Sequence, residues 1–127
     1  MTSFDWPEFL ELARTLSRGT GEAAHRTAIS RAYYYVYHLA QQRALRNGLV
    51  LNWDDSQHKK TWQFYIASPD FSCKQVGLLG QRLKERRVKA DYKHVYGGRI
   101  AEELADTFQA ADGFAAQLGR LDPRLPK

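Results

Sequence analysis

Apolar residues recur along most of the chain three or four positions apart, which is the spacing of one face of an α-helix. The clearest stripe lies in residues 99–118 and consists of Ile100, Leu104, Phe108, Ala111, Ala115 and Leu118. No segment keeps the alternation of apolar and polar residues that a half-buried β-strand requires. The pattern therefore predicts an all-α fold.

Helix-breaking residues and helix caps divide the chain into five predicted helices. The first helix begins with Asp5 as its N-cap and Pro7 in its first turn. The other four are predicted at about 22–47, 58–67, 72–92 and 99–118. We expect a single bundle of four to five helices that forms one domain over residues 1–127, with its core at about 5–119.

The predicted second helix carries large residues on nearly every side. Ile29 and Val36 lie on its apolar stripe, and four tyrosines cover most other directions, namely Tyr33, Tyr34, Tyr35 and Tyr37. A helix with apolar residues all round is buried on most sides, so this helix should be central or should face a second subunit. We predict a homodimer, because this aromatic surface is more than one small bundle is expected to cover.

The composition restricts the compartment and the chemistry. The lone Cys73 excludes an internal disulfide bond and a zinc site built from several cysteines, so we expect a reducing cytoplasm. The N-terminus lacks the segments of a signal peptide, and no run of about eighteen apolar residues would span a membrane. No P-loop, G-x-G-x-x-G or H-E-x-x-H motif is present, and we expect neither a metal nor a cofactor.

The charge of the chain favours a polyanionic partner such as RNA. The 127 residues carry a net charge of +5, and the isoelectric point is about 9.5. Basic residues are dense near the end of the predicted fourth helix, namely Arg82, Lys84, Arg86, Arg87, Lys89 and Lys93. Such a run is usually a solvated face, but the part of it beside Arg87 would attract a phosphodiester backbone.

Arg87 falls in the middle of the apolar stripe of the predicted fourth helix, where a guanidinium is costly unless it is paired. Asp91 follows four residues later, within helical contact range. His94 would share this face if the helix continued, about 10 Å further along the axis. The pattern alone favours a structural ion pair of Arg87 with Asp91. The alternative is an acid/base histidine beside a phosphate-binding arginine, with Tyr96 adding a hydroxyl or a stacking ring.

The predicted second helix repeats this spacing on one flank of its apolar stripe. Arg31 and His38 are also seven residues apart, and Tyr35 stands between them. The pattern favours edge residues that bond to neighbouring helices, because interior polar groups usually have structural partners. A role in binding stays open. His58 stands near a predicted helix start, where a capping or first-turn role accounts for it.

Two segments together resemble the HEPN-domain superfamily, whose name abbreviates "higher eukaryotes and prokaryotes nucleotide-binding". The first resembles the R-A-Y-Y…H helix of that superfamily and comprises Arg31, Ala32, Tyr33, Tyr34 and His38. The second is Arg87-Val88-Lys89-Ala90-Asp91-Tyr92, which resembles its R-x-x-A-D-Y segment. The matching order covers about residues 23–118.

The resemblance implies a helical bundle that commonly dimerises. Catalytic HEPN proteins are metal-independent endoribonucleases with an arginine, four to six residues and a histidine, which Arg87 and His94 satisfy at the upper limit. In that mechanism the RNA 2′-hydroxyl attacks the adjacent phosphate, the histidine moves a proton and the arginine stabilises the charge. His94 and Tyr96 also resemble the His-x-Tyr extension of HEPN toxins. In those proteins the active site is built across the dimer axis from both copies.

Two functions therefore remain open for this sequence. The first is an HEPN-type RNA-binding protein that acts as a metal-independent endoribonuclease, as a toxin or defence component. The second is a non-catalytic HEPN module that binds nucleotides or a partner protein, such as a separately encoded nucleotidyltransferase. The position of His94 relative to Arg87 distinguishes these two functions. The candidate binding or supporting residues are Asp91, Tyr96, Arg31, His38, Tyr35 and Arg86.

Overall fold

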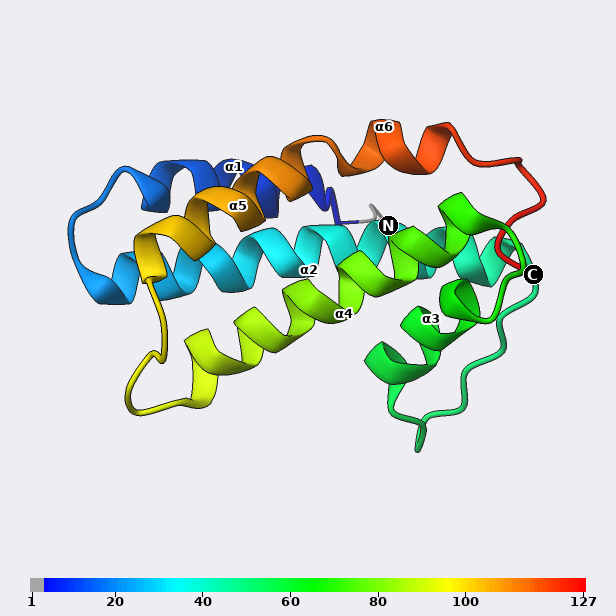
Figure 1. The fold of residues 1–127 in the computed structure, drawn as a ribbon, viewed down its shortest axis with the longest axis horizontal. Helices are drawn as coiled ribbons and strands as arrows, with labels where there is room; N and C mark the ends of the chain where they lie inside the picture. Colours follow the sequence, from blue (N-terminus) through cyan, green and yellow to red (C-terminus); the bar gives the residue numbers. More distant parts are fainter. Residues whose placement is uncertain (1–3) are drawn as a thin grey trace.

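The computed structural model describes residues 4–127, and over that range the chain is helical without a strand (Figure 1). The helices are α1 (Pro7–Ser17), α2 (Glu22–Arg46), α3 (Gln57–Ile66), α4 (Phe71–Tyr92), α5 (Ile100–Asp112) and α6 (Phe114–Gly119). The predicted all-α fold is confirmed, and the number of helices is one larger than expected.

The additional helix arises because the predicted helix 99–118 is interrupted at Gly113. This glycine has φ −92° and ψ −1° and ends α5, since glycine is among the poorest helix formers. The interruption also changes which residues face the core. Phe114 is fully buried, whereas Ala115, which the apolar stripe included, is exposed.

The start of α1 also differs from the prediction. Pro7 is the first helical residue, as expected, but Trp6 rather than Asp5 occupies the N-cap position. The Glu8 N–H donates to the Asp5 main-chain carbonyl at 2.9 Å, so Asp5 takes part through its backbone. A side-chain cap does occur at α4, where the Asp70 carboxylate accepts from the Cys73 N–H at 2.8 Å.

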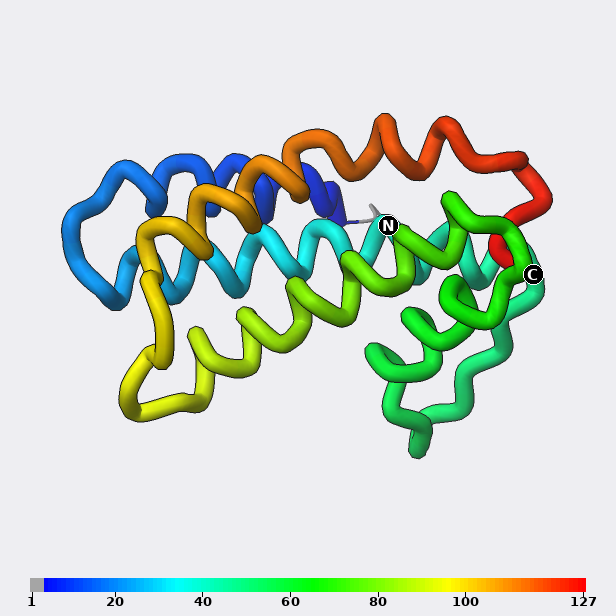
Figure 2. The backbone as a smooth tube through the Cα atoms, viewed as in Figure 1, coloured from blue at the N-terminus to red at the C-terminus, as the bar shows by residue number. Residues whose placement is uncertain are grey.

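The long helix α2 lies at the centre of the molecule (Figures 1 and 2). Helices α1 and α5 pack on one side of it, α4 packs on the other, and α3 lies mainly against α4. Its central position is as predicted, but the reason for expecting a dimer is wrong. Three of the four tyrosines are buried within the single chain, namely Tyr33, Tyr35 and Tyr37, so little aromatic surface is left over.

The close approach of α3 to α4 depends on two glycines. A Cβ at Gly80 would clash with the ring of Trp62, and one at Gly77 would lie 2.6 Å from Ile66 Cγ1. Trp62 is fully buried, so its ring has no room to move away. The bare backbone of α4 therefore allows α3 to lie across it, which fixes the first turn of α3 beside α2.

The ordered packing continues past Gly119, the expected limit of the core. Leu121 is buried, and Arg43 of α2 donates to the carbonyls of Leu118 and Leu125, each at 2.8 Å. These bonds satisfy the guanidinium of Arg43 with backbone oxygens and hold the C-terminal segment against α2.

None of the helices in the described part of the chain combines the length and the apolar character needed to cross a bilayer.

Candidate site around Arg87

Arg87 is buried between α4 and α2, with only 8% of its surface exposed. Its guanidinium carbon lies 5.5 Å from the ring centre of Tyr33, 5.4 Å from that of Tyr34 and 5.9 Å from that of Tyr92. These distances are near the outer limit for cation–π attraction, so each ring stabilises the charge weakly. The tyrosines of the R-A-Y-Y segment thus form the wall against which Arg87 lies.

The charge of Arg87 is poorly compensated within the chain. Its nearest carboxylate oxygen is Asp91 Oδ2, at 3.9 Å from Nη1. That oxygen also accepts from the Ser30 hydroxyl at 3.1 Å, and the Asp91 side chain remains 28% exposed. The buried Nε of Arg87 has no hydrogen-bond partner among the described residues. A guanidinium in this state has unused donor capacity.

His58 lies beside the tyrosines that contact Arg87, although its place in the sequence indicated only a role at a helix start. It stands in the first turn of α3 and stacks on Tyr37 with ring centres 3.8 Å apart. Its Nδ1 is 2.7 Å from the Tyr33 hydroxyl oxygen, and that oxygen accepts from the Trp62 indole N–H at 3.0 Å. His58 therefore adjoins the same tyrosines that line Arg87.

The environment of His58 disfavours its charged form. Burial is the main cause, and the positive charges of Arg87 and Lys84 add to it, lowering the pKa of His58 to about 4. The imidazole is consequently neutral at pH 7. Helical spacing along the sequence did not relate His58 to Arg87, because the two residues are 29 positions apart and lie on different helices. The packing of α3 against α2 and α4 brings His58 and Arg87 to the same tyrosines.

Arg31 and His38 also reach this side of α2. The Arg31 guanidinium lies over Tyr34 at 4.9 Å and over Phe9 at 4.8 Å. His38 stacks on Trp6 with ring centres 3.5 Å apart, and burial lowers its pKa. Their partners are aromatic rings of α1, its N-cap residue and α2, so both residues pack at the edge where α1 meets α2. Because Tyr34 contacts both arginines, it connects this edge to Arg87.

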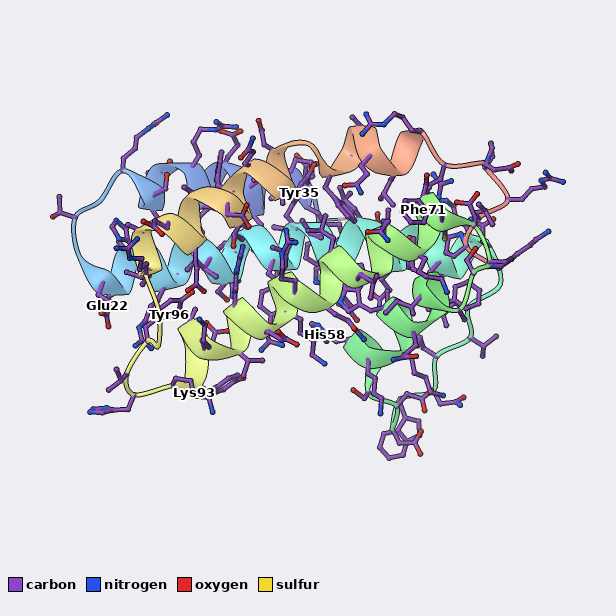
Figure 3. All side chains as sticks on the ribbon, viewed as in Figure 1. Glu22, Tyr35, His58, Phe71, Lys93 and Tyr96 are labelled. Carbon is purple, nitrogen blue, oxygen red and sulfur yellow. The ribbon has the colours of Figure 1, made fainter. Side chains whose placement is uncertain are left out.

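Tyr35, by contrast, lies away from the cluster. Figure 3 shows it on the α5 side of α2, whereas His58 lies beside the middle of α4 near the start of α3. Tyr35 is buried, and burial is the main cause of its raised pKa, with the nearby charge of Asp112 adding to it. Its position between Arg31 and His38 in the sequence therefore did not correspond to a shared face.

His94 does not continue the face of α4 that carries Arg87. The helix ends at Tyr92, and Lys93 is extended, with φ −85° and ψ 129°. His94 is exposed in the following loop, where its carbonyl accepts from Arg26 at 3.4 Å. Within residues 4–127 no interaction joins its ring to Arg87. The shared groove expected for a continuing helix is therefore absent from this arrangement.

Arg86 and Tyr96 form a separate network with α5. The Tyr96 hydroxyl donates to Glu103 at 2.8 Å, and Lys89 donates to the same carboxylate oxygen at 2.8 Å. Arg86 pairs with Asp106 and lies 3.8 Å from Glu103. These residues fix the loop after α4 onto α5, and their polar groups are paired with one another rather than with Arg87.

A shallow basic groove runs along α4. One of its lining residues is Lys84, whose charge also lowers the pKa of His58. The groove has a volume of about 370 Å³ and is lined by Gln81, Lys84, Glu85, Val88, Lys89 and Lys93. Figure 3 shows Lys93 at the far end of α4 from Phe71. In the part of the chain that the structure describes, no group of three or more histidine, cysteine or acidic residues is arranged to hold a metal ion.

Comparison of the chain with protein-family models, with curated proteins and with solved structures finds no significant match. The resemblance to HEPN domains therefore rests on the two sequence segments alone. We use the name Arg87 cluster below for Arg87 together with Tyr33, Tyr34, Asp91 and His58.

Proposed function

We propose that this chain is an HEPN-type RNA-binding protein whose Arg87 cluster receives a phosphate of the RNA backbone. The observation that carries the proposal is the nearly buried guanidinium of Arg87, whose Nε lacks a partner among the described residues and whose nearest carboxylate oxygen is 3.9 Å away. Leaving a buried charge under-satisfied costs stability, and a phosphate bound beside the guanidinium would supply a compensating negative charge.

The surroundings of Arg87 suit a single strand of RNA. Tyr92 is 72% exposed and Tyr34 is partly exposed, so both offer ring faces on which bases can stack. Lys84 stands on α4 three residues before Arg87, close enough to His58 to lower its pKa, and adds positive charge beside the cluster. Stacking and charge act on any base sequence, so we expect binding with little sequence preference.

A matched pair of aromatic variants tests this proposal. Tyr92 and Phe71 are similarly exposed, at 72% and 74%, but lie at opposite ends of α4. Fluorescence anisotropy with a single-stranded RNA about 12 nucleotides long should show binding that weakens about tenfold in Tyr92→Leu, the scale of removing one stacked base. Phe71→Leu should bind like the wild type. Equal affinities for the two variants, or no binding by the wild type, would contradict the proposal.

Metal-independent RNA cleavage is a second candidate function, although the separation of His94 from Arg87 within one chain favours the non-catalytic module. Arg26 donates to the Lys93 carbonyl at 2.6 Å, which attaches the backbone just before the exposed His94. In cleavage the RNA 2′-oxygen bonds to phosphorus as the bond to the 5′-oxygen breaks. One proton leaves the 2′-hydroxyl and one reaches the 5′-oxygen.

An RNase assay in excess EDTA tests cleavage. Wild-type protein should convert RNA to products with 2′,3′-cyclic phosphate and 5′-hydroxyl ends and leave DNA intact, because DNA lacks the nucleophile. His94→Ala should be slower by about 100-fold, the scale of a positioned acid/base group. Equal activity or equal inactivity of the two proteins would leave the non-catalytic module, which binds nucleotides or a partner such as a nucleotidyltransferase.

A homodimer belongs to the same proposal, since HEPN active sites are built from two copies. Light scattering at micromolar concentration should then report about 29 kDa, twice the chain mass of 14.6 kDa. A particle that remains at the chain mass on concentration would contradict this part of the proposal.

A further inference from the structure

A chain of hydrogen bonds leads from the buried indole of Trp62 through Tyr33 to His58. The Trp62 Nε1–H lies 3.0 Å from the Tyr33 hydroxyl oxygen, and that oxygen lies 2.7 Å from His58 Nδ1. Trp62 and Tyr33 are both fully buried. Neither group has access to water, so their protons must be shared among these three side chains.

This chain determines which nitrogen of His58 carries the proton. The indole is only a donor, so the Tyr33 oxygen accepts from it. The single hydroxyl proton of Tyr33 then needs an acceptor, and His58 Nδ1 is the one in reach. An unprotonated Nδ1 places the ring proton of neutral His58 on Nε2. The opposite tautomer would leave the buried hydroxyl proton of Tyr33 without an acceptor, which is costly.

The remaining donor, Nε2–H, belongs to a ring held firmly in place. His58 stacks on Tyr37 with an interplanar angle of 5°, and its ring centre is 5.9 Å from that of Tyr34. Arg87 lies 5.4 Å from the same Tyr34 ring. His58 and Arg87 therefore flank one tyrosine from two different helices.

The charges around His58 favour an anion. Arg87 and Lys84 face it from α4, and His38, Tyr33, Tyr34 and Tyr37 face it from α2. The first turn of α3 contains no acidic residue, and its N-cap Ser56 makes no side-chain cap. Unpaired N–H groups at a helix start add partial positive charge. Asp91 is the carboxylate that lies near Arg87.

We infer that the Nε2–H of neutral His58 is a second donor, beside Arg87, to a phosphodiester group of bound RNA, and that Tyr33 is the positioning residue that fixes this tautomer. The inference rests on the proposed RNA binding and names the residues that receive the phosphate. Nothing in the sequence spacing had assigned a binding role to His58 or Tyr33.

Nuclear magnetic resonance of the ¹⁵N-labelled chain tests the inference without relying on affinity. Long-range ¹H–¹⁵N spectra at pH 7 should show His58 protonated on Nε2. Addition of a uridine tetranucleotide without a terminal phosphate should shift the His58 nitrogens saturably, while His25 serves as an internal control and stays unchanged. The nearby phosphate should also raise the pKa of His58 from about 4 by a unit or more.

Variants separate the donor from the ring stack. His58→Phe keeps a ring over Tyr37 but has no nitrogen, and should weaken RNA binding about tenfold or more, the scale of removing one hydrogen bond to a charged group. His58→Gln keeps an N–H donor and should retain most of the affinity. Tyr33→Phe should give a mixture of His58 tautomers, provided that the variant keeps the wild-type amide spectrum.

Three outcomes would overturn the inference. The first is His58 protonated on Nδ1 in the free protein. The second is RNA that binds by anisotropy while the His58 resonances do not move, which leaves the proposed function intact. The third is a shift with inorganic phosphate but none with the tetranucleotide, which indicates a site for free anions. If no RNA binds at all, the proposed function fails as well.

Discussion

Replacing Arg87 by methionine tests whether this arginine stabilises the fold or binds a ligand. Methionine has a long unbranched side chain that fills irregular space and packs favourably against aromatic rings. It retains most of the volume among Tyr33, Tyr34 and Tyr92 but removes the charge. If Arg87 stabilises the fold, its loss should lower the free energy of unfolding. If Arg87 instead serves to bind a ligand, its loss should not.

The structure allows the size of the effect to be worked out. The substitution removes three distant cation–π interactions, together about 1 kcal/mol, and an ion pair at 3.9 Å with a partly exposed Asp91, about 0.5 kcal/mol. It also removes the desolvation cost of a guanidinium that is only 8% exposed, which amounts to several kcal/mol. The free energy of unfolding should therefore stay the same or rise by up to about 2 kcal/mol.

Urea denaturation followed by far-ultraviolet circular dichroism measures this change. Arg99→Met is the matched control, because the Arg99 side chain is 80% exposed and pairs with Glu102 in the first turn of α5. The control should lie within about 0.5 kcal/mol of the wild type. A decrease of more than about 2 kcal/mol in Arg87→Met, with the control unchanged, would show that Arg87 stabilises the fold and would refute the ligand argument.

Packing and charge lead to three further predictions. Gly80→Ala should lower the free energy of unfolding by about 2 kcal/mol or more, because the new Cβ meets the buried ring of Trp62, whereas Gly97→Ala, with nothing within 4 Å, should change it little. Asp91→Asn should lower the free energy of unfolding by about 1 kcal/mol, less than the loss of a fully buried pair, since the Asp91 side chain is 28% exposed. A clearly larger decrease in a urea titration would contradict this prediction. The free energy of unfolding should fall by about 1–2 kcal/mol as the pH drops from about 6.5 to about 4, because His58 is protonated first in the unfolded chain and its pKa in the folded chain is about 4. His58→Phe should show a smaller fall, and identical pH profiles for the two proteins would count against a buried neutral imidazole.

The helices were predictable from the sequence where the periodicity was long and the breakers were strong. The ranges of α2 and α4 matched the prediction to within a residue, because Gly48 and the Asp70 cap mark real ends. Gly113 was overlooked since the apolar stripe continues on both sides of it. Periodicity assumes an unbroken helix, so it did not indicate that Phe114 rather than Ala115 turns toward the core after the interruption.

The candidate site was predictable only in part. Arg87 and Asp91 are four residues apart on one helix, so their proximity follows from helical geometry. His94 was placed by extending that helix, and the chain leaves the helix at Lys93. The packing of α3 on α4 brings His58 near the tyrosines that line Arg87. That packing depends on Gly77 and Gly80, and no spacing along the sequence encodes such an approach.

The affinity of Arg87→Met for single-stranded RNA tests most directly whether the buried guanidinium serves a ligand. Anisotropy at one fixed salt concentration should show binding at least about tenfold weaker than that of Arg99→Met, although both variants lack one positive charge. Equal weakening in the two variants would mean that only net charge attracts the RNA, and would contradict a phosphate site at Arg87.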